Sequence, residues 1–321
     1  MRPDPAVATR CLESLQGQPC IRLTTAQGDS ALVALHGAQV LSWVAGGRER
    51  LYLSPKAVFD GRSAIRGGIP LCFPQFNQRG PLPKHGFARN LGWRPAPASK
   101  EGDRQSSVCL ELTDSETTRA WWPVRFAAQL TVVLGAGSLR VQLAVHNTGN
   151  TDDGAWDFTT ALHTYLRVED VGRAQLGGLD GCARWDALTD ARGVQQGPVM
   201  FSGEYDRVFS APAGAIHLHD GALGLQITQS ASLSNTVVWN PGGALCARLA
   251  DLPPDGYRSM LCVEAAQIDR PITLAPGSSG RAGRNFGCCR RRDATAAWRR
   301  GGVGRCARPG HRCGCRCAYA S

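Results

Sequence analysis

The chain has 321 residues and a mass of 34.3 kDa, and 43% of its residues are hydrophobic, which is enough for one large domain or two average ones. Its formal net charge of +10 comes entirely from residues 281–321, which hold 11 arginines and one acid, whereas residues 1–280 hold 25 basic and 25 acidic residues. This distribution argues against a basic nucleic-acid-binding face on the main body of the protein.

The cysteines are divided in the same way. Seven are spread singly through residues 1–280, and six lie within residues 288–317. Isolated cysteines inside apolar runs are typical of reduced, buried thiols. No basic-then-apolar signal opens the chain, and no apolar run reaches the ~18 residues of a membrane span. We therefore expect a cytoplasmic protein that does not associate with membranes.

The pattern of side chains along residues 1–280 predicts strands. Runs of β-branched or alternating apolar residues are separated by clusters of Gly, Asp, Asn and Pro, and amphipathic helical periodicity is scarce. The runs cover residues 21–25, 31–44, 108–112, 126–145, 156–168, 216–228, 236–239 and 260–265. Two hairpins are expected, at residues 135–138 and 220–223. Many short strands without βαβ alternation indicate an all-β fold, an antiparallel sandwich or barrel.

The composition changes near residue 280. Residues 281–321 are rich in Arg, Gly and Cys, show no strand periodicity, and carry too little apolar surface to offset the entropy of ordering them. A zinc site and a basic RNA-binding tail are alternative interpretations, but the Cys-x-Cys-x-Cys spacing at residues 313–317 lacks the paired Cys-x-x-Cys of structural zinc sites. We expect one domain at residues 1–280 and a tail at residues 281–321 that is disordered or non-native.

Two segments rich in turn-forming residues carry cations. They read RGGIPLCFP at residues 66–74 and HGFAR at residues 85–89. Backbone bends in such segments direct side chains such as Arg66, Arg89 and His85 toward a ligand instead of the core. The planar fork of arginine suits phosphate or carboxylate oxygens, so two arginines in one irregular region predict an anion pocket. The alternative is a structural loop whose arginines are solvated or paired with carboxylates.

A histidine lies within the predicted strand at residues 156–168. Alternation places Asp157, His163 and Arg167 on the more polar face, where a sheet would line a cleft. Histidine is the side chain best suited to proton transfer near neutral pH. The alternative is a half-exposed histidine on a solvated face.

A carboxylate interrupts an apolar strand at residues 260–266, which read MLCVEAA. Burial of Glu264 is costly unless the group is paired or used, and desolvation would raise its pKa toward the range of about 6–7 that suits a general base. The alternative is a structural Glu bonded to a backbone donor or an arginine. No serine nucleophile elbow, P-loop or dinucleotide fingerprint occurs in a suitable context. His163 and Glu264 therefore suggest acid–base catalysis on a neutral polyol.

Two further residues are candidates for contact with a polyol. Asp206 precedes a short apolar pair and could bind hydroxyl groups or close a turn. Trp239 ends a predicted strand and could stack against a sugar face or belong to the core.

Taken together, these segments resemble the aldose 1-epimerase superfamily, and more closely its hexose-6-phosphate mutarotase (glucose-6-phosphate 1-epimerase) branch. The order and spacing of the motifs hold over roughly residues 20–280. The matching segments are residues 66–70, 85–89, 158–166, 206–208, 238–241 and 262–266.

The resemblance implies a galactose-mutarotase-like β-supersandwich with its site on a concave face. It implies an isomerase that interconverts the α and β anomers of a hexose 6-phosphate, with D-glucose 6-phosphate as the expected substrate. Glu264 would take the proton of the C1 hydroxyl and His163 would protonate the ring oxygen, without metal or cofactor. Arg66 and Arg89 become candidates for the 6-phosphate, and Asp206 becomes a sugar ligand.

The chain departs from the family pattern at two places. Lys84 stands before the His-Gly-Phe motif, where many relatives carry Gln; a cation there is compatible with phosphate, so Lys84 and His85 join the predicted substrate-binding residues. After the turn at residues 276–279 relatives form one last strand, whereas this chain continues with Arg/Cys-rich sequence. A frameshift near residue 280 is our hypothesis for this change, and we expect the last strand to be missing or altered.

Two other functions are consistent with the same motifs. One is a mutarotase for unphosphorylated aldoses, and the other is a non-catalytic carbohydrate-binding or regulatory protein. The paired arginines favour a phosphorylated sugar, and a matched acid and base favour turnover. We expect a monomer whose partner is a small sugar phosphate, and neither nucleic acid nor a membrane.

Overall fold

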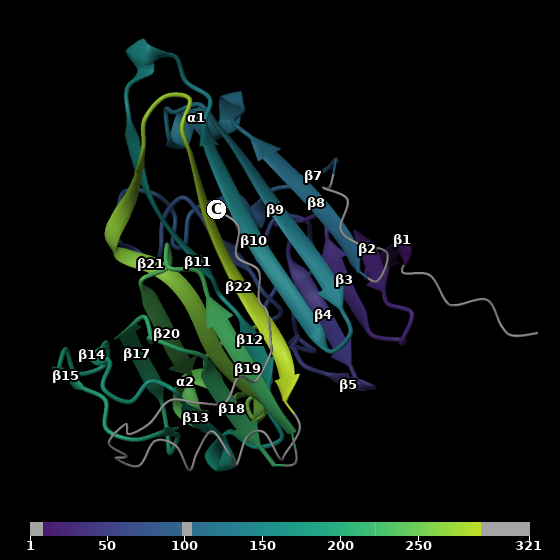
Figure 1. Ribbon diagram of the computed structural model, residues 1–321, viewed down its shortest axis with the longest axis vertical. Helices are drawn as coiled ribbons and strands as arrows, with labels where there is room; N and C mark the ends of the chain where they lie inside the picture. Colours follow the sequence, from purple (N-terminus) through teal and green to yellow (C-terminus); the bar gives the residue numbers. More distant parts are fainter. Residues whose placement is uncertain (1–8, 98–104, 222, 290–321) are drawn as a thin grey trace, which may run out of the picture.

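The computed structural model describes residues 9–97, 105–221 and 223–289 (Figure 1). Its strands form a five-stranded, a nine-stranded and an eight-stranded sheet, in which the strand pairings are antiparallel. Helices are few and short. The all-β fold expected from the alternating sequence pattern is confirmed.

The five-stranded sheet contains the N-terminal part of the described chain, in the strand order β1-β2-β3-β4-β5. Its strands are β1 (Thr9–Leu15), β2 (Gln18–Thr24), β3 (Ser30–Ala34), β4 (Val40–Ala45) and β5 (Arg48–Glu49). The single run predicted at residues 31–44 is two strands, because Gly37 and Ala38 both take positive φ and turn the chain between β3 and β4.

The nine-stranded sheet has the order β16-β13-β18-β19-β22-β10-β9-β8-β7. Its strands are β7 (Arg94–Ala96), β8 (Ser106–Thr113), β9 (Phe126–Gly135), β10 (Ser138–Asn147), β13 (Gln175–Gly177), β16 (Val199–Met200), β18 (Ile216–Asp220), β19 (Leu223–Gln229) and β22 (Ser279–Cys289). Both predicted hairpins are present, since β9 pairs with β10 around residues 135–138 and β18 pairs with β19 around residues 220–223.

The eight-stranded sheet has the order β15-β14-β17-β20-β21-β11-β6, with β12 also paired to β21. Its strands are β6 (Leu71–Cys72), β11 (Trp156–Leu162), β12 (Tyr165–Arg167), β14 (Ala183–Asp186), β15 (Arg192–Val194), β17 (Tyr205–Ser210), β20 (Asn235–Asn240) and β21 (Met260–Leu274).

Short helices connect the strands. They are α1 (Glu116–Trp121), α2 (Gly242–Cys246) and the 3₁₀ turns η1 (Ala88–Asn90), η2 (Thr151–Asp153), η3 (Val171–Arg173) and η4 (Gly256–Ser259). Over the described ranges, none of the helices combines the length and apolarity needed to cross a membrane.

The last described strand corrects two expectations. β22 is neither missing nor a tail: it lies at the centre of the nine-stranded sheet and pairs with β10 on one side and β19 on the other (Figure 1). The domain boundary expected at residue 280 therefore falls inside β22. Its apolar pattern is weak, and pairing of its backbone with two neighbours holds the strand in place. The rest of the predicted tail, residues 290–321, lies outside the described residues.

The hydrophobic core joins all three sheets. One cluster contains Trp43 of β4, Phe126 of β9, Phe209 of β17 and Phe286 of β22. The rings of Trp43 and Phe286 have centroids 5.9 Å apart, so the five-stranded sheet packs directly against β22.

Candidate active site

The eight-stranded sheet carries a cavity of about 620 Å³, within the usual size range of ligand pockets. Strands β17, β20 and β21, the β11–β12 junction and the irregular segment at residues 63–90 all contribute to its lining. The seven residues that we predicted from the sequence all line it: Arg66, Lys84, His85, Arg89, His163, Asp206 and Glu264. Their placement in one cavity is observed, whereas the role of each remains a prediction.

Two glycines allow the irregular segment to pack closely under the cavity. Gly68 has φ +62°, and a Cβ there would lie 2.0 Å from the carbonyl oxygen of Val40. Gly86 has φ +71°, and a Cβ there would lie 2.2 Å from the carbonyl oxygen of Phe73. Only glycine fits such a conformation and such contacts. Gly68, two residues after Arg66, and Gly86, next to His85, therefore fix the backbone that presents these side chains.

His163 and Glu264 form the floor of the cavity. His163 Nδ1 lies 3.2 Å from Glu264 Oε1, and the two residues are 9% and 1% exposed. Within the described part of the chain, His163 Nδ1 and Glu264 Oε2 have no hydrogen-bond partner. The 3.2 Å approach joins His163 Nδ1 to the other carboxylate oxygen, Oε1, and lacks hydrogen-bond geometry. Two reactive groups are thus buried side by side with unused bonding capacity.

The sequence misplaced His163 in the middle of a strand. β11 ends at Leu162 and β12 begins at Tyr165, so His163 lies in the break between them. Its amide donates to the carbonyl oxygen of Pro70 at 2.9 Å, while that of Thr164 donates to the carbonyl oxygen of Leu162 at 2.8 Å. These local bonds replace the sheet ladder and hold the imidazole at the cavity floor, where its ring stacks on that of Tyr165.

Burial shifts the two groups in opposite directions. Desolvation lowers the pKa of His163 well below its ordinary value, and the positive groups Arg89 and Arg66 lower it further. Desolvation and the nearby Asp206 carboxylate raise the pKa of Glu264 well above its ordinary value. Both shifts favour the neutral form of each group.

His85 borders this pair with an imidazole in a fixed tautomer. Its Nδ1 accepts a hydrogen bond from the Asn77 amide at 3.3 Å and lies 3.1 Å from Cys72 Sγ. The neutral ring therefore carries its proton on Nε2. Desolvation and the cations Arg89 and Lys84 lower the pKa of His85 to about 3, so the ring stays neutral near pH 7.

The four cations that line the cavity are not equivalent. Arg79 pairs with Asp269 at 3.1 Å. Arg66 is held by Asp251 Oδ2 at 2.9 Å and by the Tyr165 hydroxyl at 2.9 Å, so its charge is already paired. Arg89 donates from Nη2 to the carbonyl oxygen of Lys84 at 3.0 Å, and its Nε has no partner in the described ranges. Among the described residues, neither Arg89 nor Lys84 forms an ion pair with a carboxylate.

Acidic and aromatic residues complete the wall. Asp206 lies on β17, and desolvation together with the neighbouring Glu204 raises its pKa to about 6. Trp239 of β20 meets His163 and Tyr165 edge-on, with ring centroids 6.5 and 6.3 Å away. The sequence left open whether Trp239 lines the site or belongs to the core. In the structure Trp239 lines the cavity and also packs against the core.

Sequence reasoning missed the partners of these groups. Asp251 follows Arg66 by 185 residues, and nothing near either residue signals their ion pair. Glu204 lies two residues before Asp206, directly ahead of β17, and this spacing was the available signal for a shared acidic wall.

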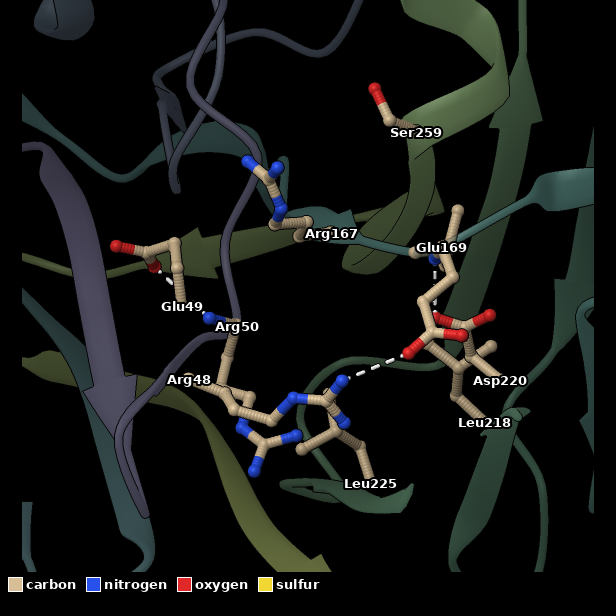
Figure 2. Close-up of a pocket in the computed structure, with 10 residues that line it drawn as sticks. Arg48, Glu49, Arg50, Arg167, Glu169, Leu218, Asp220, Leu225 and Ser259 are labelled. Carbon is tan, nitrogen blue, oxygen red and sulfur yellow. Dashed lines mark hydrogen bonds and ion pairs between the residues drawn. The ribbon is translucent and has the colours of Figure 1, made fainter. Parts of the chain in front are cut away.

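A second, smaller cavity of about 210 Å³ is lined by Arg48, Arg50, Arg167 and acids that include Glu169 (Figure 2). Arg48 pairs with Glu169 at 2.9 Å, and Arg50 donates to the carbonyl oxygen of Ala45 at 3.1 Å. Arg48 and Arg50 are thus already bound to other groups of the protein. The motif residues line the larger cavity, and we place the chemistry there.

Comparison with known proteins agrees with this arrangement. The family model described as Aldose 1-epimerase matches residues 19–286. A protein from Cenchrus ciliaris named "Putative glucose-6-phosphate 1-epimerase" is 36% identical over 287 residues, which cover 86% of this chain and 87% of that one. A protein of the same name from Salmonella typhimurium is 37% identical over 249 residues, which cover 75% of this chain and 81% of that one.

Solved structures give the same result. The crystal structure of a "putative mutarotase" from Salmonella typhimurium superposes with a TM-score of 0.79 at 32% identity, covering 89% of this chain and 94% of that one. A galactose mutarotase-like protein from Clostridium acetobutylicum shares the fold, with a TM-score of 0.69 at 14% identity over 88% of this chain and 99% of that one. The β-supersandwich is therefore confirmed, and the chain belongs to the aldose 1-epimerase family of isomerases.

Proposed function

We propose that this protein interconverts the α and β anomers of a hexose 6-phosphate, with D-glucose 6-phosphate as the preferred substrate. The observation that carries the proposal is the pair formed by His163 and Glu264, 3.2 Å apart on the floor of a cavity of about 620 Å³. The names of the relatives from Cenchrus ciliaris and Salmonella typhimurium support the same substrate.

The reaction needs two proton transfers in each direction. In ring opening the Glu264 carboxylate takes the proton of the C1 hydroxyl, and the O1–H electron pair becomes the new C1=O1 bond. The C1–O5 bond breaks, and its electron pair takes a proton from the His163 imidazolium. Rotation about C1–C2 and reclosure with the roles reversed give the other anomer. The protons are returned, so the pair ends each cycle as it began.

One proton on the pair is the number that this cycle requires. A protonated Glu264 beside a neutral His163 and a carboxylate beside an imidazolium differ only in which group holds the proton. Burial favours the neutral form of each group. A bound sugar that offers a hydroxyl donor and a ring-oxygen acceptor stabilises the ionised form, which is the reactive one.

The phosphate is assigned to Arg89 and Lys84. These two cations lie on the cavity wall and form no ion pair with a carboxylate in the described part of the chain, so phosphate oxygens can take their charge. Arg66 is already paired with Asp251, which suits it better to a sugar hydroxyl than to the phosphate. Asp206 offers its carboxylate to the sugar hydroxyls.

The test is anomer exchange measured by saturation-transfer NMR on the full chain, with glucose 6-phosphate, glucose and galactose compared. Acceleration of exchange confined to glucose 6-phosphate is the expected result. Acceleration of the free sugars alone would move the activity to unphosphorylated aldoses. Binding of the sugar phosphate without acceleration, in folded protein, would contradict catalysis and favour a carbohydrate-binding role.

A further inference from the structure

We propose that the cavity floor is also an inhibitory binding site for a zinc-like divalent cation, with His163, Cys262 and Glu264 as its three protein ligands. The inhibitory part of this inference rests on the proposed function, whereas binding of the ion does not.

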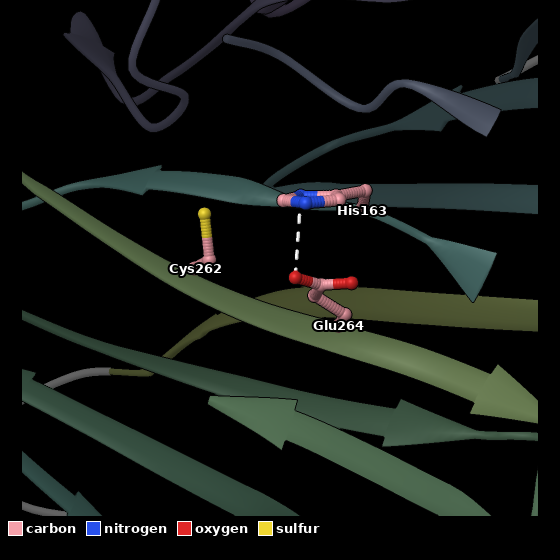
Figure 3. A group of neighbouring side chains, drawn as sticks. All are labelled: His163, Cys262 and Glu264. Carbon is pink, nitrogen blue, oxygen red and sulfur yellow. Dashed lines mark ion pairs between the residues drawn. The ribbon is translucent and has the colours of Figure 1, made fainter. Parts of the chain in front are cut away.

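The three side chains come together from β21 and from the β11–β12 junction beside it. Cys262 and Glu264 are two residues apart on β21 and therefore share a face, and His163 projects from the junction beside that strand (Figure 3). One ligand atom from each of the three residues lies within 4.8 Å of the others. Cys262 is a free thiol, and all three residues are buried.

The spacing suits a metal ion after a small contraction. Zn–N and Zn–O bonds of about 2.0–2.2 Å and a Zn–S bond of about 2.3 Å in a tetrahedron place ligand atoms roughly 3.3–3.8 Å apart. His163 Nδ1 and Glu264 Oε1 are already 3.2 Å apart. The remaining closure is about 1 Å, which rotation of the Cys262 side chain can supply.

Unused bonding capacity points to a ligand at this place. His163 Nδ1 and Glu264 Oε2 are buried atoms without a hydrogen-bond partner in the described ranges. A nitrogen, a sulfur and a carboxylate oxygen form a donor set that borderline-soft ions such as Zn²⁺ and Co²⁺ prefer, whereas Mg²⁺ and Ca²⁺ require mostly oxygen.

Charge balance also favours a divalent ion. The ion binds Cys262 as a thiolate and Glu264 as a carboxylate, so both groups release their protons to solvent when the ion binds. Two anionic ligands and one neutral imidazole then balance the charge of the ion in a buried place. The fourth coordination position faces the cavity, since His163 and Glu264 line it and Cys262 does not. Water or a sugar hydroxyl can fill that position, as in open zinc sites.

Occupation of this site blocks both proton-transfer groups at once. A bound ion uses the lone pairs with which His163 and Glu264 would exchange protons with the sugar. Zinc is therefore expected to inhibit anomer exchange, and a chelator is expected to restore it.

Binding is tested with Co²⁺ as a spectroscopic probe on the chelator-treated full chain. We expect a sulfur-to-cobalt charge-transfer band in the wild type that is absent from Cys262→Ser and from Glu264→Gln. Cys246→Ser is the matched control, because Cys246 is also fully buried but lies outside the group of three. Cysteines beyond residue 287 are present in every variant, so their contribution cancels in the difference spectrum. An unchanged band in both Cys262→Ser and Glu264→Gln would overturn the site.

Inhibition is tested by titrating Zn²⁺ into the anomer-exchange assay, with Mg²⁺ as a control ion. We expect Cys262→Ser to keep its activity in chelator and to need at least about tenfold more Zn²⁺ for half-inhibition. Equal sensitivity of Cys262→Ser and wild type would contradict the role of Cys262. A folded wild type that is inactive in chelator but shows the Cys262-dependent cobalt band would refute the proposed function and leave the ion site standing.

Discussion

At the scale of single residues, the surroundings of His163 and Glu264 set the pKa values and the hydrogen bonding of this reactive pair. Burial and the charge of Arg89 lower the pKa of His163. Burial and the charge of Asp206 raise the pKa of Glu264. The same burial leaves one atom of each without a hydrogen bond among the described residues. Such unsatisfied groups are costly in a core and are typical of functional sites.

The first prediction concerns the pair itself. His163→Ala and Glu264→Gln should each lower kcat for glucose 6-phosphate by at least about a hundredfold, because each removes one of two coupled proton transfers. The measurement is anomer exchange by NMR, with circular dichroism to verify the fold. His219→Ala is the control, since His219 lies on β18 outside the cavity. Unchanged kcat in either variant would remove that residue from the mechanism.

The second prediction concerns pH. Because the pKa of His163 is lowered, this imidazole gains a second proton only well below pH 6.5. Because the pKa of Glu264 is raised, this carboxyl group keeps its proton well above pH 4.5. The kcat/KM for glucose 6-phosphate, which reports the free enzyme, should therefore show no acid inflection near pH 6.5 beyond the one that the second phosphate ionisation of the substrate near pH 6 produces. Titration of the free substrate measures that contribution separately. An acid limb centred on the usual histidine value would contradict the burial argument.

The third prediction separates phosphate binding from chemistry. Arg89→Ala should raise the KM for glucose 6-phosphate about ten- to a hundredfold, because a charge-assisted contact to the phosphate is lost, and should leave the binding of free glucose unchanged. Arg94→Ala is the matched control, because Arg94 is exposed on β7 and outside the cavity. An equal effect on both sugars would argue against a phosphate contact.

At the scale of elements, β22 carries the most unusual residue of the fold. Arg284 is fully buried, and its Nε and both Nη atoms have no hydrogen-bond partner in the described part of the chain. It lies over the ring of Phe286 at 5.6 Å, which compensates only part of the lost hydration. Desolvation lowers the pKa of Arg284 to about 9, so the folded state holds this proton less tightly than the unfolded state.

The fourth prediction follows from this burial. Arg284→Met should raise the free energy of unfolding at pH 7 by about 1–3 kcal/mol, because it removes a buried charge without hydrogen bonds whose desolvation outweighs its attraction to Glu264. Stability of the wild type should rise with pH as pH approaches and passes 9, where the folded state loses a proton that the unfolded state keeps. Denaturant unfolding in reductant measures both. Arg281→Met, an exposed change on the same strand, should have little effect. A less stable Arg284→Met would show that the guanidinium is needed.

At the scale of the whole molecule, one strand joins two halves of the largest sheet. β19 and the strands beyond it lie on one side of β22, and β10 and the strands beyond it lie on the other (Figure 1). The chain therefore completes its central sheet with the last described residues, and its early and late segments depend on each other.

The fifth prediction tests this dependence. A chain that ends after residue 278 should lose its cooperative unfolding transition, because two strand edges and the contacts of Phe286 with the core are exposed. A chain that ends after residue 289 keeps β22 and is the matched comparison. Thermal unfolding followed by circular dichroism distinguishes them. A similar melting temperature for both chains would show that β22 is dispensable.

The sequence alone determined the fold class and the local chemistry. Side-chain alternation predicted most strands, including both hairpins, and burial of Glu264 followed from the apolar run around it. Gly68 and Gly86 lie in the two segments that the sequence predicted to be turn-forming. These features are local, since the two-residue period of a strand and the conformational freedom of glycine are written within a few residues.

Only the tertiary structure decided which distant residues meet. It pairs Arg66 with Asp251, brings Cys262 beside His163 and places β22 at the centre of a sheet, although the sequence pattern predicted a tail there. Strand partners and their register depend on the packing of the whole chain, so no short pattern encodes them. The identity of the reactive groups is thus local, and their protonation and their neighbours are properties of the folded molecule.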